Sequence, residues 1–182
     1  TRSSCKPRHW HPKWSSEYQI IVVEYDKRCV LLMPPRERRV NIMNTYSVDE
    51  QRLVDTFCHL VTIDAATGNE RKIADELTAR LKALGAAVRE DDAGAAIGGN
   101  TGNIIALFTG DKPDVPAIML SAHMDRVEPG QGIRPRIENG IIRSSGDTIL
   151  AADDLAGAAA ILEALTVIKE QKISHGPIEV VF

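Results

Sequence analysis

The sequence predicts an α/β protein, a three-layer sandwich around a mixed, largely parallel sheet. Segments with helical periodicity alternate with short apolar runs, which is the pattern of such folds. The 182 residues suffice for one ordinary domain, and 43% apolar with 26% charged residues is a globular composition. No apolar run approaches the roughly 18 residues of a membrane helix. We therefore expect neither a membrane span nor a secretory signal.

Composition divides the chain after residue 42. Residues 1–42 hold neither glycine nor alanine, whereas all 13 glycines lie in residues 43–182. Nine Lys/Arg against four Asp/Glu give the first segment a charge of +5, and 13 against 21 give the second −8. At average usage a stretch of this length would hold about three glycines. We predict that residues 1–42 are an atypical extension, non-native or disordered, and that residues 43–182 form the folded unit.

Three interpretations of the first segment compete. It could be translated upstream DNA joined to a gene that begins at Met43, which the compositional break favours. It could be a genuine extension, such as a short β segment over Tyr18–Met33. Trp10 and Trp14 among basic residues are also compatible with a nucleic-acid-binding arm, but the basic residues are scattered and mixed with acidic ones. We therefore predict no nucleic-acid partner and assign this segment no function.

Two helices are expected first in the second segment. Ser47 and Glu50 form a capping box, and apolar residues recur behind it at helical spacing. Thr67 and Glu70 repeat the device ahead of a second helix, which Gly85 is placed to end. A short strand over 87–90 and a glycine-rich turn over 94–102 should follow.

The remaining elements complete the α/β alternation. Strands are expected over 103–108 and 117–121, the latter a continuous apolar run typical of a buried central strand. Two strands flank Asn139-Gly140, a strong hairpin signal. A helix over 156–170 and a buried strand over 178–182 come last. Because that strand has no turn or polar residue after it, we expect that the polypeptide has been cut short and that the fold is incomplete.

Two acidic clusters are candidates for chemistry. His123 and Asp125 directly follow a strand, at the end where open α/β sheets place ligands. The histidine could bind a metal while Asp125 orients its ring, or the two could form a structural pair. Asp153 and Asp154 precede a helix, where one could cap it. Two adjacent carboxylates repel, however, and a divalent cation would relieve that repulsion. Together the clusters offer nitrogen and oxygen ligands suited to a di-zinc hydrolase.

The stretch from about residue 49 to 182 resembles the peptidase T-like aminopeptidases, relatives of aminoacylase and the zinc carboxypeptidases. The matching segments, written in one-letter code, are IGGNTGN (97–103), LSAHMD (120–125), IENG (137–140) and TILAADD (148–154). The resemblance implies two zinc ions, with His123 a ligand of one and Asp153 bridging both. It further implies that Asp125 is the catalytic acidic partner that orients His123. Asp154 is implied as a neighbouring acidic residue, often joined to Asp153 by a cis bond.

The resemblance also implies an activity and what this chain lacks for it. The parent enzyme would hydrolyse the N-terminal residue of short peptides. A glutamate pair that supplies the general base, further ligands, and a lid domain needed for a homodimer would all lie beyond Phe182. We thus expect no general base in this chain. Rival hypotheses are a truncated, inactive fragment and a related amidohydrolase that acts on acylated amino acids.

Three departures from the family pattern and the cysteines complete the sequence-based expectations. Arg126, Ala151 and Leu155 stand where the family has threonine, glycine and lysine, and we expect Arg126 to add a positive charge beside the metal face. The three cysteines are odd in number and lack CxxC spacing, which argues against a disulfide framework and favours a reducing cytoplasm.

Overall fold

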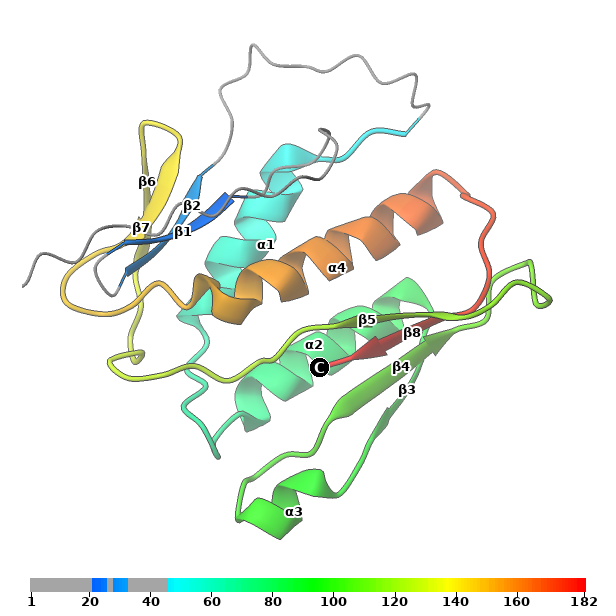
Figure 1. Ribbon diagram of the computed structural model, residues 1–182, viewed down its shortest axis with the longest axis horizontal. Coiled ribbons are helices and arrows are strands. Elements are labelled where there is room, and N and C mark those ends of the chain that lie inside the picture. The colour runs from blue at the N-terminus through cyan, green and yellow to red at the C-terminus, as the bar shows by residue number, and fades with distance from the viewer. Residues whose placement is uncertain (1–20, 26–27, 33–45) are drawn as a thin grey trace, which may run out of the picture.

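A computed structural model describes residues 21–25, 28–32 and 46–182. The prediction for residues 1–42 therefore falls largely outside the described residues. The first helices and strands, in chain order, are β1 (Ile21–Tyr25), β2 (Arg28–Leu32), α1 (Glu50–Thr62), α2 (Arg71–Leu84), β3 (Ala87–Glu90) and α3 (Ala93–Ile97). They are followed by β4 (Ile104–Phe108), β5 (Ile118–Ser121), β6 (Pro135–Glu138), β7 (Ile141–Ser144), α4 (Ala152–Glu170) and β8 (Ile178–Val181). Figure 1 shows their arrangement.

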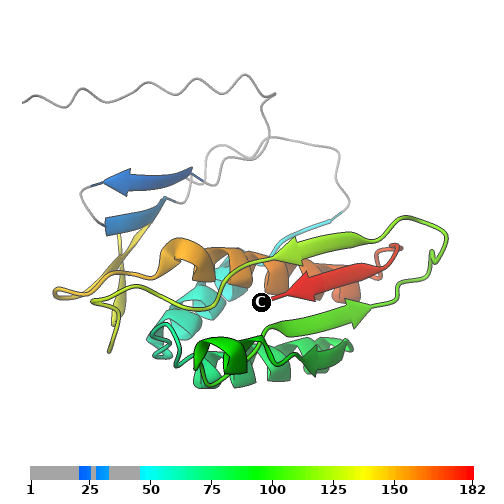
Figure 2. The same ribbon diagram turned by 60° about the horizontal axis from the view of Figure 1, so that its bottom comes forward.

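The main sheet has the strand order β3-β4-β8-β5. β3 with β4 and β4 with β8 are antiparallel, whereas β5 and β8 run parallel. The predicted mixed α/β sheet is confirmed, but among the described strands antiparallel pairings outnumber the parallel one instead of the sheet being largely parallel. α2 and α4 pack along this sheet, and α1 packs on α4 (Figures 1 and 2). Of the three layers expected, the described residues supply the sheet and one helical layer.

Alternation along the strands sets which side of the sheet is buried. Ile104, Ala106, Ile178 and Val180 belong to the core cluster that includes the apolar faces of α1, α2 and α4. On the opposite face, which no helix covers in the described residues, Met119 is 66% exposed. The core therefore lies between the sheet and the helices.

The prediction that residues 117–121 form a buried central strand is wrong. β5 is an edge strand in the described residues, with Ile118 55% exposed, and β8 occupies the interior of the sheet. A continuous apolar run shows that both faces of a strand are compatible with burial, but it does not specify its position in the sheet.

A second sheet, also of four strands, has the order β1-β2-β7-β6. The predicted hairpin is confirmed: β6 and β7 are antiparallel, and Asn139 and Gly140 both have positive φ, at 53° and 75°, as a type I′ turn requires. β1 and β2 form an antiparallel pair, and β2 adjoins β7. The β1–β2 hairpin falls within Tyr18–Met33, the β segment that the sequence suggested for residues 1–42.

Both predicted capping boxes are wrong. Asp49, not Ser47, caps α1, because its Oδ1 accepts a hydrogen bond from the backbone N–H of Arg52 at 3.0 Å. Thr67 makes no cap for α2, as described below. The end of α2 is as predicted, since Gly85 adopts the left-handed conformation with φ 103°.

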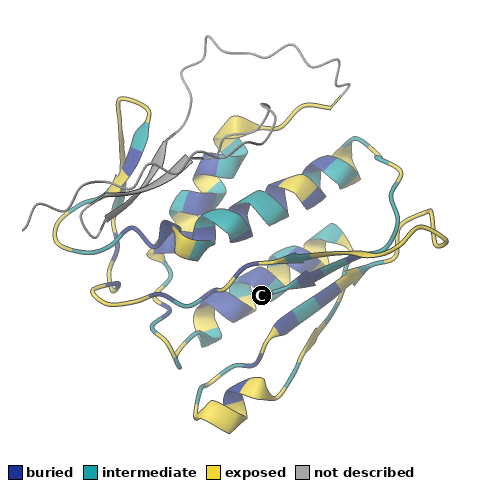
Figure 3. Ribbon diagram, in the orientation of Figure 1, coloured by how far each residue is buried: buried dark blue, intermediate teal, exposed yellow. Residues whose placement is uncertain are grey.

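Two further segments differ from expectation. The glycine-rich turn contains the short helix α3, which is exposed apart from Gly94 (Figure 3). α4 is assigned from Ala152 rather than from 156, with non-helical backbone at Asp153 and Asp154. Among the described residues, none of the helices is both long and apolar enough to cross a membrane.

Candidate active site

The two predicted clusters meet at the carboxyl end of β5. The N–H of Ala122 donates to the carbonyl of Val181 at 3.2 Å, which continues the pairing of β5 with β8 and places the next residue, His123, at the sheet edge. His123 Nε2 lies 2.9 Å from Asp153 Oδ1, at the start of α4. His123 Nδ1 lies 3.1 Å from Asp125 Oδ1 and 3.2 Å from the backbone carbonyl oxygen of the same residue. The structure thus brings together the three residues that the sequence singled out.

This cluster is open to solvent, and its charges act on the histidine. The side chain of His123 is 49% exposed and that of Asp153 is 75% exposed. Partial burial of the ring opposes its protonation, but the hydrogen bond to Asp153 and the charges of Asp153 and Asp125 outweigh this effect. The pKa of His123 is therefore raised above its ordinary value, because both ring nitrogens face a carboxylate.

The two adjacent aspartates have different roles. Asp154 Oδ1 accepts a hydrogen bond from the N–H of Gly157 at 3.2 Å, as a helix N-cap does. Asp153 instead faces His123, so the cap and the ligand interpretations each describe one of the pair. The Asp153–Asp154 peptide bond is cis, as the family resemblance implied. A Cβ atom on Gly157 would overlap the Asp154 carboxylate, which explains glycine at this position.

The sequence did not indicate a hydrogen bond that the second carboxylate oxygen of Asp125 accepts. Thr67 Oγ1 donates to Asp125 Oδ2 at 2.8 Å across 58 positions of sequence. Thr67 lies in the connection between α1 and α2, and its sequence signal was a capping motif. Only the approach of this connection to the segment after β5 reveals the contact.

A cavity of about 480 Å³ adjoins His123 and Asp125. One wall is the glycine-rich segment 93–102, where the backbone passes close to itself. A Cβ atom on Gly94 would overlap the carbonyl oxygen of Thr101, so a side chain cannot be accommodated there. The cavity provides space for a small ligand directly beside the histidine.

Glu90 fixes the position of the glycine-rich segment 93–102 through hydrogen bonds. Its Oε1 accepts hydrogen bonds from Arg71 Nη1 at 2.9 Å and from the N–H of Gly102 at 3.0 Å. These bonds, that to Arg71 above all, lower the pKa of Glu90 to about 2. The carboxylate is thus charged at neutral pH and joins β3, α2 and the loop that closes the cavity.

Arg126 does not lie where the sequence suggested. Its side chain is 2% exposed, and its guanidinium donates to the backbone carbonyls of Val61, Ile63 and Gly130 instead of facing the metal side of the site. The expected positive charge beside the metal face is therefore wrong. The last turn of α1 leaves carbonyls without helical partners, and the buried guanidinium satisfies them.

The other two departures also lie in the interior. Ala151 is buried and has φ 56°, a left-handed conformation that glycine adopts more readily than alanine. Leu155 is fully buried in the core cluster. Neither side chain therefore adds a charge to the site.

The donor set fits part of a zinc site. A histidine nitrogen and a carboxylate oxygen 2.9 Å apart suit adjacent ligands of one ion, and Asp125 occupies the position that orients a ligating histidine. Structural and catalytic zinc sites use at least three protein ligands. Within residues 46–182, no group of three or more His, Cys, Asp or Glu is arranged to hold one ion. His123 and Asp153 therefore match two members of a larger ligand set.

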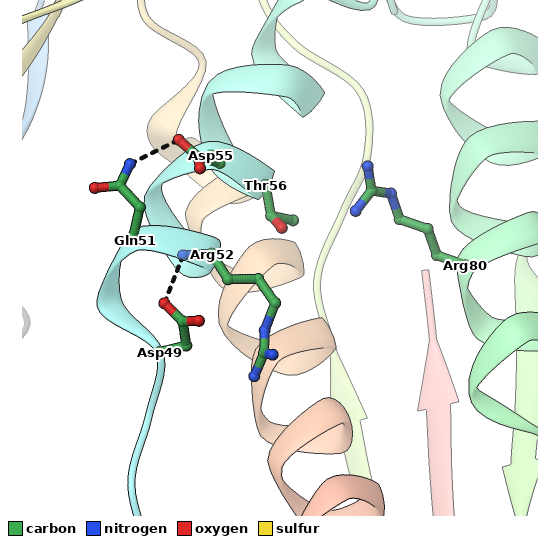
Figure 4. A pocket seen from close by; sticks show the side chains of 6 residues that line it. All are labelled: Asp49, Gln51, Arg52, Asp55, Thr56 and Arg80. Carbon is green, nitrogen blue, oxygen red and sulfur yellow. Dashed lines mark hydrogen bonds between the residues drawn. The ribbon is translucent and has the colours of Figure 1, made fainter.

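A second cavity, of about 380 Å³, is lined by Asp49, by residues of α1 and by Arg80 of α2 (Figure 4). Both of its arginines have acidic partners outside this lining. Arg52 contacts Glu163 at 2.7 Å and Glu170 at 2.9 Å, which joins α1 to α4. Arg80 Nε contacts Glu76 at 2.7 Å. The sequence did not indicate Glu163, which is buried by this pairing. We interpret these contacts as structural.

Comparisons place the chain among known proteins. No protein-family model matches it. The uncharacterized protein YqjE of Bacillus subtilis is 44% identical over 132 residues, which cover 72% of this chain and 35% of YqjE. An aminopeptidase PepT from Bacillus cereus is 44% identical with a TM-score of 0.72, and a tripeptidase from Staphylococcus aureus is 44% identical with 0.71. Each match covers 74% of this chain and 36% of the solved one, so the chain spans about a third of these relatives.

Proposed function

Since this chain is related in sequence and fold to the peptidase T-like aminopeptidases, a metallopeptidase family, we propose that it supplies part of a zinc-dependent site. The site would hydrolyse the N-terminal residue of short peptides. The observation that carries the proposal is the 2.9 Å approach of His123 Nε2 to Asp153 Oδ1, with Asp125 on the far side of the ring. The relatives named an aminopeptidase and a tripeptidase favour peptides over acylated amino acids as substrates.

Each residue has a role in this proposal. His123 Nε2 and Asp153 Oδ1 would hold zinc, and Asp153 would bridge to a second ion. Asp125 faces Nδ1 of His123 with its carboxylate at 3.1 Å and its backbone carbonyl at 3.2 Å, and so would leave Nε2 for the metal. Asp154 keeps its hydrogen bond from the N–H of Gly157, where the regular helical backbone of α4 begins. Bound zinc supplies a water of lowered pKa and polarises the substrate carbonyl.

The proposal requires groups from outside the described residues. A general base and at least one more ligand must join His123 and Asp153. Glu179 does not substitute for them, since its register on β8 pairs it with Met119 of β5, on the face away from the core. The two-donor arrangement also supports the rival in which this chain by itself is an inactive fragment that binds metal weakly.

The proposal also covers the cellular compartment and the binding partners. The free thiol of Cys58 on α1 is compatible with a reducing compartment, and we propose the cytoplasm. The partners would be short peptides, with a homodimer only where a lid domain is present.

A chimera tests the proposal. Residues 46–182 replace the matching part of the B. cereus aminopeptidase, so that the relative supplies the remaining two thirds. We expect zinc-dependent hydrolysis of a tripeptide, at least 100-fold slower after His123→Ala. The control is His175→Ala, at the opposite end of β8, where the backbone N–H bonds Asp111. A folded chimera without activity would support the inert fragment, and full activity in His123→Ala would overturn the ligand assignment.

A further inference from the structure

We propose that Thr67 is a positioning residue, which fixes the carboxylate of Asp125 and through it the imidazole of His123. This inference rests on the proposed function for its purpose, because an oriented histidine matters where Nε2 binds a metal. Thr67 belongs to none of the matching family segments quoted above, and the sequence suggested only a helix cap for it. The structure gives it a different partner.

Each oxygen of the Asp125 carboxylate has its own partner, a hydrogen bond from Thr67 and a salt-bridge contact with His123. Oδ2 accepts from Thr67 Oγ1 at 2.8 Å, and Oδ1 lies 3.1 Å from His123 Nδ1. A carboxylate held at one oxygen alone can rotate about its Cβ–Cγ bond, since that torsion is broad. Held at both oxygens, it presents Oδ1 to the ring in one orientation. Thr67 thus restricts the group that restricts the histidine.

The backbone that carries Thr67 is itself fixed to the segment after β5. The N–H of Arg126 donates to the carbonyl of Ala65 at 3.1 Å, and Ala66 and Arg126 form a parallel β-bridge. Thr67 directly follows Ala66, and Asp125 directly precedes Arg126, so both residues adjoin this bridge. The guanidinium of Arg126 also donates to carbonyls at the end of α1. Arg126 therefore fixes both the end of α1 and the connection that leads from it to α2.

Capping of α2 does not explain Thr67. The first residue of α2, Arg71, donates its backbone N–H to Asn100 Oδ1 at 3.0 Å. Glu70 Oε1 accepts from the N–H of Gly68. The hydroxyl of Thr67 is directed at Asp125, and its exposed side chain contributes little to the core. Removal of the hydroxyl should therefore change the site and leave the fold intact.

The test compares Thr67→Val, which removes the hydroxyl at nearly constant shape, with Thr67→Ser, which restores it. Thr166→Val is the matched control, because Thr166 Oγ1 donates to the carbonyl of Leu162 within α4 at 2.7 Å. We expect Thr67→Val to weaken zinc binding by the chimera described above about tenfold, the usual effect of losing such an outer partner. Thr67→Ser and Thr166→Val should stay within twofold of the parent.

A second measurement needs no metal. In the metal-free protein at fixed pH, NMR follows solvent exchange of the His123 Nδ1–H proton, assigned by its loss in His123→Ala. We expect exchange to be at least fivefold faster in Thr67→Val and unchanged in Thr67→Ser. Parent-like exchange in Thr67→Val would overturn the positioning role, as would failure of serine to restore it. Absence of zinc binding by the unsubstituted chimera would count against the proposed function, while the exchange rates would still decide the role of Thr67.

Discussion

The buried guanidinium of Arg126 provides the sharpest test of how this fold is held together. Replacement by methionine keeps an unbranched chain of similar length but removes all donors. The carbonyls of Val61, Ile63 and Gly130 then lose their partner inside the protein. Each unsatisfied buried carbonyl costs about 1–3 kcal/mol, so the two buried ones give a loss of about 2–6 kcal/mol, to which the partly buried carbonyl of Ile63 adds a smaller amount.

An opposing effect reduces this loss. Burial lowers the pKa of Arg126, which shows that the charge itself is unfavourable there, and removing a buried charge recovers several kcal/mol. We expect the carbonyls to dominate, because water cannot reach a site where the side chain is 2% exposed. Arg126→Met should therefore lower the free energy of unfolding by about 3 kcal/mol, a large share of the 5–15 kcal/mol typical of a domain.

Urea denaturation followed by circular dichroism measures this change. Arg143→Met is the control, since Arg143 lies exposed on β7, and it should change the free energy by less than about 0.5 kcal/mol. A loss in Arg126→Met below about 1 kcal/mol would refute the reasoning. It would mean that relief of the buried charge balances the three hydrogen bonds.

Three further predictions concern the site and its surroundings. Gly102→Ala should destabilise the fold by about 2 kcal/mol in urea denaturation, because the added Cβ would overlap the backbone carbonyl of Asp91; an unchanged midpoint would contradict this. Ala151→Val should cost at least about 2 kcal/mol and Ala151→Gly less than about 1 kcal/mol, because φ is positive there; equal effects of both in thermal unfolding would count against it. Because bonding to Arg71 lowers the pKa of Glu90 to about 2, its stabilisation is complete above the unfolded value of 4.5 and is lost as pH falls toward 2. After solvent screening we expect Glu90→Gln to remove about 1 kcal/mol at pH 7 and almost nothing at pH 2, and a loss independent of pH would exclude this origin.

Local sequence signals predicted those features that depend on local chemistry. Asn139-Gly140 predicted its hairpin because a type I′ turn needs two positive φ values, and Gly85 predicted a helix end for the same reason. His123 was identified by its position after a strand, and Asp153 by its position at the start of a helix. These signals need only the residue type and its immediate neighbours.

Contacts between distant segments could not be predicted in this way. Thr67 looked like a cap, because nothing in its neighbourhood indicates Asp125. The position of Arg126 depends on where α1 ends, 63–65 residues earlier in the chain. The prediction that β5 lies inside the sheet was wrong, because strand order is decided by pairing and not by hydrophobicity alone.

The most direct test of the central claim is the position of zinc. Crystals of the chimera described above, grown with zinc, give an anomalous difference map at the zinc absorption edge. Our account predicts a zinc ion about 2.1 Å from both His123 Nε2 and an Asp153 carboxylate oxygen, with Asp125 still bonded to the other ring nitrogen. A map with no zinc in contact with His123, whether the ions lie elsewhere or at this site, would contradict it.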